Sequence, residues 1–125
     1  MTRKTKGEVE AEISQVLVKF ELEYMGRGPS DVRTHLLGDM VVVRLKGILT
    51  PAERQLVKAE GVELIKQVRA KLLETGQSML KQSLEELTGL SIVSMHSDLS
   101  TTTGERIIVF VMSGDVEKKF GGHRR

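Results

Sequence analysis

The sequence predicts one α+β domain in which two β-hairpins form an antiparallel sheet and helices pack against it. Two stretches carry apolar residues at helical spacing, four shorter stretches have strand character, and the order is α-ββ-α-ββ. The length of 125 residues suits a single domain with its own core. We expect this domain to span residues 1–125, with 1–6 and 113–125 as loose tails, because the hydrophobic pattern is lost there.

An amphipathic helix is expected from about Gly7 to Tyr24. Its apolar residues recur at steps of three or four, and charged residues fill most positions between them. The helix should end at Gly26, which favours a left-handed cap, before Pro29, which cannot continue a helix. The apolar residues of this stretch are Val9, Ile13, Val16, Leu17, Phe20 and Tyr24.

A tight hairpin should follow, with strands at residues 31–37 and 40–46 joined by Gly38-Asp39. Glycine at the first position of a two-residue loop indicates a type II′ turn, which fixes the register of the strands. Arg33 then lies opposite Arg44 on one face of the hairpin. The other face carries the expected core residues Val32, Thr34, Leu36, Val41, Val43 and Leu45.

A long helix is expected from Pro51 to Thr88. Thr50-Pro51-Ala52-Glu53 has the residues of a capping box, and an apolar stripe continues in helical phase through Gly76. One helix of that length would measure about 57 Å, whereas a compact domain of this size is only about 36 Å across. Either the helix breaks near Glu74–Gln77, or it projects and pairs with a second chain. Gly61, on the stripe, either permits close approach of another backbone or is simply tolerated.

A second hairpin is expected from residues 90–99 and 105–112 around the loop 100–104. Matching the apolar faces places Met95 opposite Val109 on the first face, and Asp98 opposite Arg106 on the second. The second sheet face then mixes apolar with charged side chains, so either the first helix or a second subunit should cover it. We expect a homodimer. The residues assigned to this face are Arg33, Leu37, Met40, Val42, Arg44, Lys46, Ile92, His96, Asp98, Ile108 and Phe110.

The composition excludes several classes of function. The absence of cysteine excludes disulfides, thiolate metal sites and cysteine nucleophiles, and three histidines leave little for a metal site. Four aromatic residues are too few for a base-stacking single-strand binder. Apolar runs are far shorter than the roughly 18–20 residues that span a bilayer, and no signal peptide is evident. We therefore expect a cytoplasmic protein without a membrane span, metal or cofactor.

Two groups of residues suggest chemistry. Like charges opposite each other on a ladder are destabilising, so Arg33 and Arg44 call for a nearby negative group. With Arg27 and Lys46 they form either an anion pocket or a cluster neutralised by the protein's own carboxylates, such as Asp31 or Asp98.

The second group is Ser94, His96 and Asp98, which alternate along one strand face. No nucleophile elbow or oxyanion loop accompanies them, so a surface His–Asp pair is favoured over a catalytic triad. No phosphate-binding motif is present either, since the loop 100–104 lacks the spaced glycines and lysine of a P-loop. We therefore expect no catalytic residues.

Two segments, GRGPSDVRTHLLGDMVVVRLKGILTPAERQL and HSDLSTTTGERIIVFVM, resemble the MpsC family, formerly domain of unknown function 2294. The family takes its name from a sodium-translocating membrane-potential-generating system. The resemblance implies a small protein accessory to cation or bicarbonate transport, peripheral at the inner membrane face. The positions that match the family pattern, and would form a shared interaction surface, are Arg27, Gly28, Pro29, Arg44, Lys46, His96 and Asp98.

Three functions are therefore considered. The first is a non-catalytic accessory protein that docks on a membrane transporter subunit through the mixed apolar and cationic sheet face. The alternative is a small basic nucleic-acid- or anion-binding module, whose binding would collapse steeply with salt. The third is an enzyme acting through His96 and Asp98, which the sequence favours least.

Overall fold

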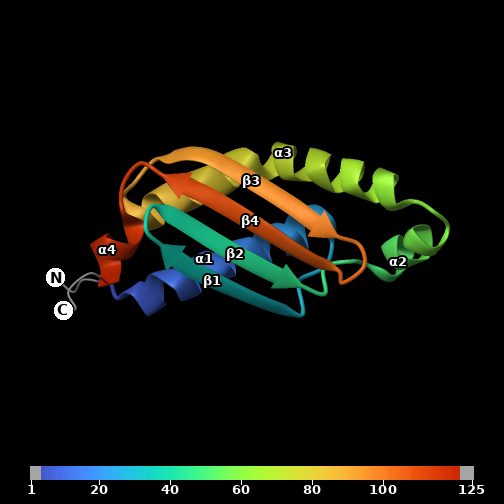
Figure 1. Ribbon diagram of the computed structural model, residues 1–125, viewed down its shortest axis with the longest axis horizontal. Helices are drawn as coiled ribbons and strands as arrows, with labels where there is room; N and C mark the ends of the chain where they lie inside the picture. The colour runs from blue at the N-terminus through green and yellow to red at the C-terminus, as the bar shows by residue number, and fades with distance from the viewer. Residues whose placement is uncertain (1–3, 122–125) are drawn as a thin grey trace.

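The computed structural model describes residues 4–121, and it confirms the α+β class and the predicted order of helices and hairpins (Figure 1). Two helical segments lie at the N-terminus, two more separate the hairpins, and a short helix follows the last strand. The elements are α1 (Lys6–Phe20), η1 (Glu21–Met25), β1 (Asp31–Leu37), β2 (Met40–Lys46), α2 (Pro51–Lys58), α3 (Val62–Thr88), β3 (Ile92–Ser100), β4 (Glu105–Met112) and α4 (Val116–Gly121).

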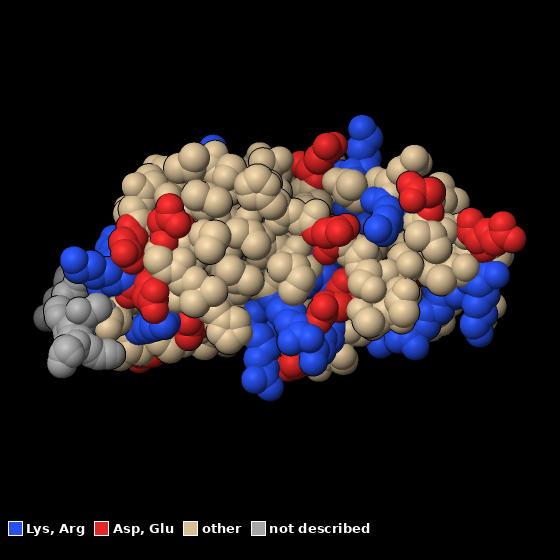
Figure 2. All heavy atoms as spheres, viewed as in Figure 1, with Lys and Arg blue, Asp and Glu red and all other residues tan. Residues whose placement is uncertain are grey.

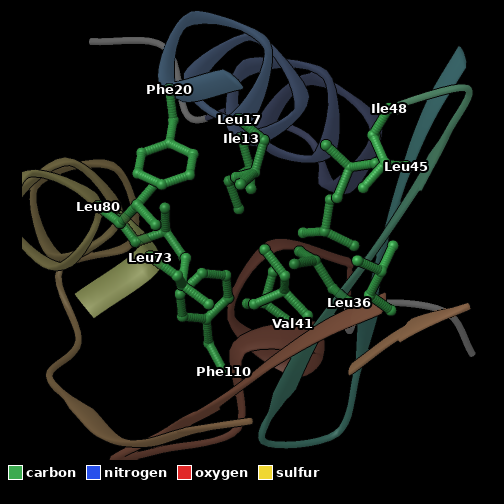
Figure 3. Close-up of a cluster of buried hydrophobic side chains, with 14 of the residues drawn as sticks. Ile13, Leu17, Phe20, Leu36, Val41, Leu45, Ile48, Leu73, Leu80 and Phe110 are labelled. Carbon is green, nitrogen blue, oxygen red and sulfur yellow. The ribbon is translucent and has the colours of Figure 1, made fainter. Parts of the chain in front are cut away.

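The four strands form one antiparallel sheet in the order β1-β2-β4-β3, so β2 and β4 join the two hairpins at its centre. Helices α1 and α3 lie together behind this sheet in Figure 1. The core fills the space between them, where Phe20 of α1, Leu80 of α3 and Phe110 of β4 have no exposed surface (Figure 3). We call the sheet face toward α1 and α3 the inner face, and the opposite face the outer face.

The N-terminal helix begins and ends close to the predicted residues. Thr5 caps α1, its hydroxyl accepting from the Glu8 amide, while the Glu8 carboxylate accepts from the Thr5 amide. The helix then widens into the π-helical turn η1 and stops at Gly26, whose φ of +81° is the left-handed cap that the sequence indicates.

The first hairpin has the predicted register. Arg33 pairs with Arg44 and Leu36 with Val41, across a turn in which Gly38 takes a φ of +60°. Leu36, Val41 and Val43 lie on the inner face and are fully buried. The turn residues therefore determined which side chains reach the core, as a two-residue loop should.

The second hairpin corrects the predicted register by one residue. Met95 pairs with Phe110, and Leu99 rather than Asp98 pairs with Arg106, because a bulge between Ile92 and Ser94 shifts the strand. A shift of one residue exchanges the two faces of a strand. Ile108 and Phe110, which we expected on the second face, are therefore fully buried on the inner face.

The central helical segment breaks, but the expected position of the break at Glu74–Gln77 is wrong. The chain turns at residues 59–61, where Glu60 has a φ of +64° and the Gly61 amide donates to the Leu56 carbonyl at 2.6 Å. A side chain at position 61 would lie 2.7 Å from that oxygen, so this glycine serves close backbone approach. Helix α3 then runs unbroken for 27 residues, about 40 Å.

Gly76 lies within α3 without breaking it, and its missing side chain leaves room for the Phe20 ring of α1. A Cβ atom at this position would lie 2.2 Å from Phe20 Cε1, so only glycine lets the two helices approach this closely. The Phe20 ring in turn stacks on Tyr24, with 4.8 Å between the ring centroids. Gly76, which lies within the segment where one alternative placed a break, therefore serves helix packing.

The segment that follows β4 is not a loose tail up to residue 121. It forms α4, whose Val116 is fully buried and whose Glu117 accepts a hydrogen bond from the Gly38 amide at 2.9 Å. Lys6 of α1 forms an ion pair with the same carboxylate at 3.0 Å. The apolar residues of α4 span too few positions for the sequence to predict a helix there. In the expected N-terminal tail, Thr5 and Lys6 cap and begin α1. Residues 1–3 and 122–125 lie outside the described residues.

Candidate functional site

The outer face of the sheet is not covered by any of the helices in residues 4–121 (Figure 1). The register places its side chains in three rows across β1, β2, β4 and β3. An apolar row stands at one end, a row with histidines at both edges in the middle, and a charged row at the other end. The rows are Leu37-Met40-Val111-Ser94, His35-Val42-Val109-His96 and Arg33-Arg44-Ile107-Asp98.

The centre of the outer face is apolar. The side chains of Val42, Val109 and Val111 are only half-buried, and Leu37 at the edge is 47% exposed. Figure 2 shows the result as a broad area over the sheet without charged side chains. A solvated face of an antiparallel sheet normally carries polar residues, so this face has the composition of a contact surface.

A cationic corner adjoins the apolar centre. Arg33, Arg44 and Lys46 lie on neighbouring outer positions of β1 and β2, and basic side chains gather beside the apolar area in Figure 2. Arg33 forms an ion pair with Asp31 at 3.5 Å, and Arg44 forms one with Glu105. The protein's own carboxylates therefore neutralise the opposed arginines, and binding of an external anion by this set stays a prediction.

The remaining sequence-predicted residues are only partly brought together. Arg27, Gly28 and Pro29 belong to the loop that precedes β1 and are half-buried. On β3, His96 Nε2 lies 3.1 Å from the Ser94 hydroxyl, whereas Asp98 accepts from the Leu99 amide and forms an ion pair with Lys66 at 3.8 Å. Ser94, His96 and Asp98 thus form neither the relay of a catalytic triad nor the surface His–Asp pair that the sequence favoured, because Asp98 is engaged by Leu99 and Lys66 instead.

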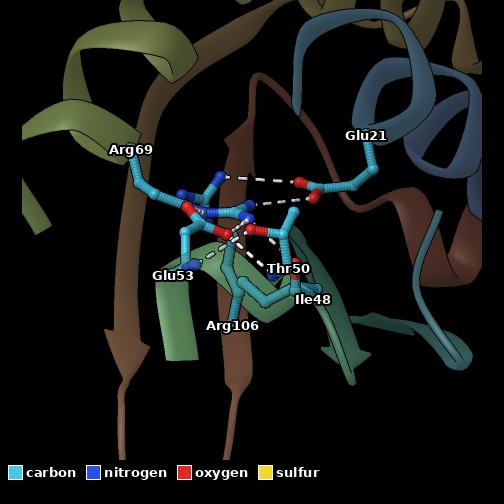
Figure 4. Close-up of polar contacts among 6 residues, drawn as sticks. All are labelled: Glu21, Ile48, Thr50, Glu53, Arg69 and Arg106. Atoms are coloured by element: carbon cyan, nitrogen blue, oxygen red, sulfur yellow. Dashed lines mark hydrogen bonds and ion pairs between the residues drawn. The ribbon is translucent and has the colours of Figure 1, made fainter. Parts of the chain in front are cut away.

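A buried ionic network, which sequence reasoning missed, lies on the inner face (Figure 4). Arg69 of α3 is its centre and is 1% exposed. Its guanidinium donates twice to the Glu53 carboxylate, at 2.9 and 2.5 Å, once to Glu21 at 3.2 Å, and once to the Ile48 carbonyl at 2.8 Å. Arg106 of β4 completes the network through an ion pair with Glu21 at 3.7 Å.

Burial changes the ionisation of this network. Desolvation raises the pKa of Glu21 above its ordinary value, although Arg106 and Arg69 act against the shift. Desolvation lowers the pKa of Arg106, with Glu21 opposing. Burial also acts to raise the pKa of Glu53, but the hydrogen bonds from Arg69 and Thr50 outweigh it and hold that pKa below its usual value.

The sequence does contain a signal for the network. Glu21 stands four residues after Leu17 and Arg69 four residues after Ile65, so both continue an apolar helical stripe. Arg106 likewise precedes Ile108 and Phe110 on the same face of its strand. Charged residues in phase with core positions indicate buried pairs when opposite signs occur together.

Among residues 4–121, no three histidine or acidic side chains are placed to hold a metal ion, and none of the helices combines the length and the hydropathy of a membrane span. The family model described as "Na+-translocating membrane potential-generating system (MpsC)" matches residues 5–114. The uncharacterized protein YbcI of Bacillus subtilis (strain 168) is 46% identical over 117 residues, which cover 93% of this chain and 94% of YbcI. YrhF of the same organism, also uncharacterized, is 26% identical over 110 residues, covering 86% of this chain and 90% of YrhF. No solved structure matches.

Proposed function

The chain belongs to the MpsC family, and from this membership we propose that it is a non-catalytic accessory protein that docks on a membrane-potential-generating transport system. The description of the family names the transport system, and the outer face of the sheet would be the surface that contacts it. The protein would act in the cytoplasm, at the inner membrane face, through a subunit of the transporter.

One observation carries this proposal: the outer face is apolar at its centre, cationic at one corner and free of any covering helix in residues 4–121. Interfaces combine an apolar core with a polar, solvent-accessible rim. Val42 and Val109, neighbours across β2 and β4, would form the centre of contact. Arg33 and Lys46 would meet acidic groups of the partner and orient it.

The same face suits a second copy of the chain when the transporter is absent. The cationic corner lies where β1 begins and β2 ends, whereas the exposed Asp39 lies in the turn at the opposite end of these strands. A two-fold axis in the plane of the sheet and perpendicular to the strands would place each cationic end over the acidic end of the other copy. We therefore propose a homodimer that exchanges its second copy for the transporter subunit.

The test compares two outer-face variants, Val42→Lys and Val109→Lys, with the control Leu64→Lys. Leu64 is 52% exposed on α3 and lies outside the sheet. Wild type and the control should co-purify with a transport subunit from native membranes and scatter light as dimers when purified. The two outer-face variants should lose both properties while keeping their thermal unfolding midpoint.

Two results would overturn the proposal. Equal membrane retention for all four proteins would show that the outer face is not the contact. Retention that disappears only when nucleic acid is digested, and that falls steeply with salt, would instead support the nucleic-acid-binding alternative.

A further inference from the structure

A cavity of about 350 Å³ opens between α3 and the edge strand β3, away from the outer face. Its walls are apolar where Ala70, Leu73, Met95 and Leu99 line it. The charged lining residues are three cations and two carboxylates, so the cations prevail by one; they are Lys66, Arg69, Arg106, Glu74 and Asp98. A cavity of this volume with apolar walls and converging charged groups suits a small ligand.

The buried Arg106 side chain lacks hydrogen-bond acceptors for part of its guanidinium within the described residues. It is 2% exposed, yet its Nε and Nη1 atoms donate no hydrogen bond within the described residues. Its Nη1 lies 3.7 Å from Glu21 Oε2, which is too long for a hydrogen bond and leaves that oxygen without one as well. Buried arginine donors normally find acceptors, so this side chain indicates a missing one.

The neighbouring cations differ from Arg106 in what they can offer. Arg69 is engaged by Glu53, Glu21 and the Ile48 carbonyl, and it has no such shortage of acceptors. Lys66 stands at the mouth of the cavity, 41% exposed, and its ion pair with Asp98 is long at 3.8 Å. Such a solvated pair is weak, so Lys66 can turn toward a ligand at little cost.

We propose that this cavity binds a small organic monoanion, a carboxylate on a short apolar body, whose carboxylate is held by Arg106 and Lys66. The apolar body would lie against Ala70, Leu73 and Met95. Arg106 would exchange its long contact with Glu21 for a charge-assisted hydrogen bond, while Glu21 keeps its bond to Arg69 at 3.2 Å. The cavity shares only Asp98, at its rim, with the outer face, and the inference does not rest on the docking proposal.

The probe is hexanoate, with hexan-1-ol and hexylammonium as neutral and cationic ligands of the same length. Titrations at pH 7 are followed by the methyl resonances of Met95 and Ala70, which line the cavity. Hexanoate should shift both resonances with saturation. Hexan-1-ol should bind about tenfold more weakly, because it lacks the charge that Arg106 requires, and hexylammonium should not bind.

Four variants locate the site. Arg106→Gln should weaken hexanoate binding at least tenfold, and Lys66→Gln about two- to fivefold. Ala70→Leu should abolish binding by filling the cavity at an exposed helix position, so it tests the site even if the Arg106 variant does not fold. The control Lys71→Gln, 85% exposed on the same helix and outside the cavity, should bind as wild type does.

Three results would overturn this inference: hexan-1-ol binding as tightly as hexanoate, Ala70→Leu binding hexanoate normally, or no saturable shift at all. The outer-face variant Val109→Lys should still bind hexanoate, because Val109 lies on the other side of the sheet. Loss of docking with retained hexanoate binding would therefore separate the two proposals.

Discussion

Replacing Arg69 with methionine should destabilise the fold by about 3–5 kcal/mol, the usual cost of removing one partner from a buried ion pair. Methionine keeps much of the side-chain volume, so the loss reflects polar contacts rather than a cavity. Four hydrogen bonds disappear, and Glu21, with no exposed surface, keeps only its long contact with Arg106. At roughly 4 °C per kcal/mol, the unfolding midpoint should fall by about 12–20 °C.

The loss should depend on pH with a definite sign. Burial already raises the pKa of Glu21 in the folded protein, and removal of the Arg69 guanidinium should raise it further. A carboxyl whose folded pKa exceeds its unfolded value destabilises the protein at high pH, and protonation relieves this below the folded pKa. Arg69→Met should therefore be closer to wild type in stability at pH 5 than at pH 8.

Urea unfolding at both pH values measures these free energies, and a double-mutant cycle assigns them. Glu21→Gln removes the buried charge with little change of shape, so Glu21→Gln should recover part of the stability lost in Arg69→Met. The control Lys71→Met, at an 85% exposed position of the same helix, should change stability by less than about 0.5 kcal/mol. A loss below about 1 kcal/mol for Arg69→Met, or the same loss at pH 5 and 8, would refute this reasoning.

Two further predictions concern helix packing and acid unfolding. Gly76→Ala should destabilise the protein by about 1–3 kcal/mol, because the added Cβ would overlap the Phe20 ring. The control Gly7→Ala, in the open first turn of α1, should leave stability unchanged or raise it by up to about 1 kcal/mol. Thermal melting curves of the two variants check these opposite signs. Glu53, whose pKa its hydrogen bonds with Arg69 and Thr50 lower despite burial, contributes stability that is present above about pH 4.5 and lost as the pH falls through its folded pKa. Glu53→Gln should therefore lose less stability than wild type between pH 7 and pH 3; an unchanged loss would contradict this.

The parts of the fold that local rules determine were predictable from the sequence. The Thr50 capping box and the Gly38-Asp39 turn each act within a few residues, and both form as expected. The second hairpin was not, since its four-residue loop, 101–104, leaves the register open and no turn motif marks the bulge between Ile92 and Ser94. The helix break at Glu60 also has no strong signal, because a non-glycine residue adopts the positive φ there.

The candidate site was predictable only on its outer side. The opposed arginines of β1 and β2 follow from the register of the first hairpin alone. The buried network requires Glu21, Glu53, Arg69 and Arg106 to converge from four elements distant in sequence. Sequence reasoning places each charged residue outside by default, because a lone buried charge is costly. Only the tertiary structure shows that the charges compensate one another.

The register of β4 determines both which residues join the buried network and which residues form the outer face. Arg106 belongs on the inner face because Glu21 supplies a buried charge partner there. Side chains alternate along a strand, so an inward Arg106 obliges Ile107, Val109 and Val111 to point outward. The predicted register would have buried these three residues and placed Arg106, Ile108 and Phe110 on the outer face instead. A buried ion pair often adds little net stability, but it can select one register over another. In this chain the selected register buries Ile108 and Phe110 beside Arg106 and leaves Ile107, Val109 and Val111 half-buried on the outer face.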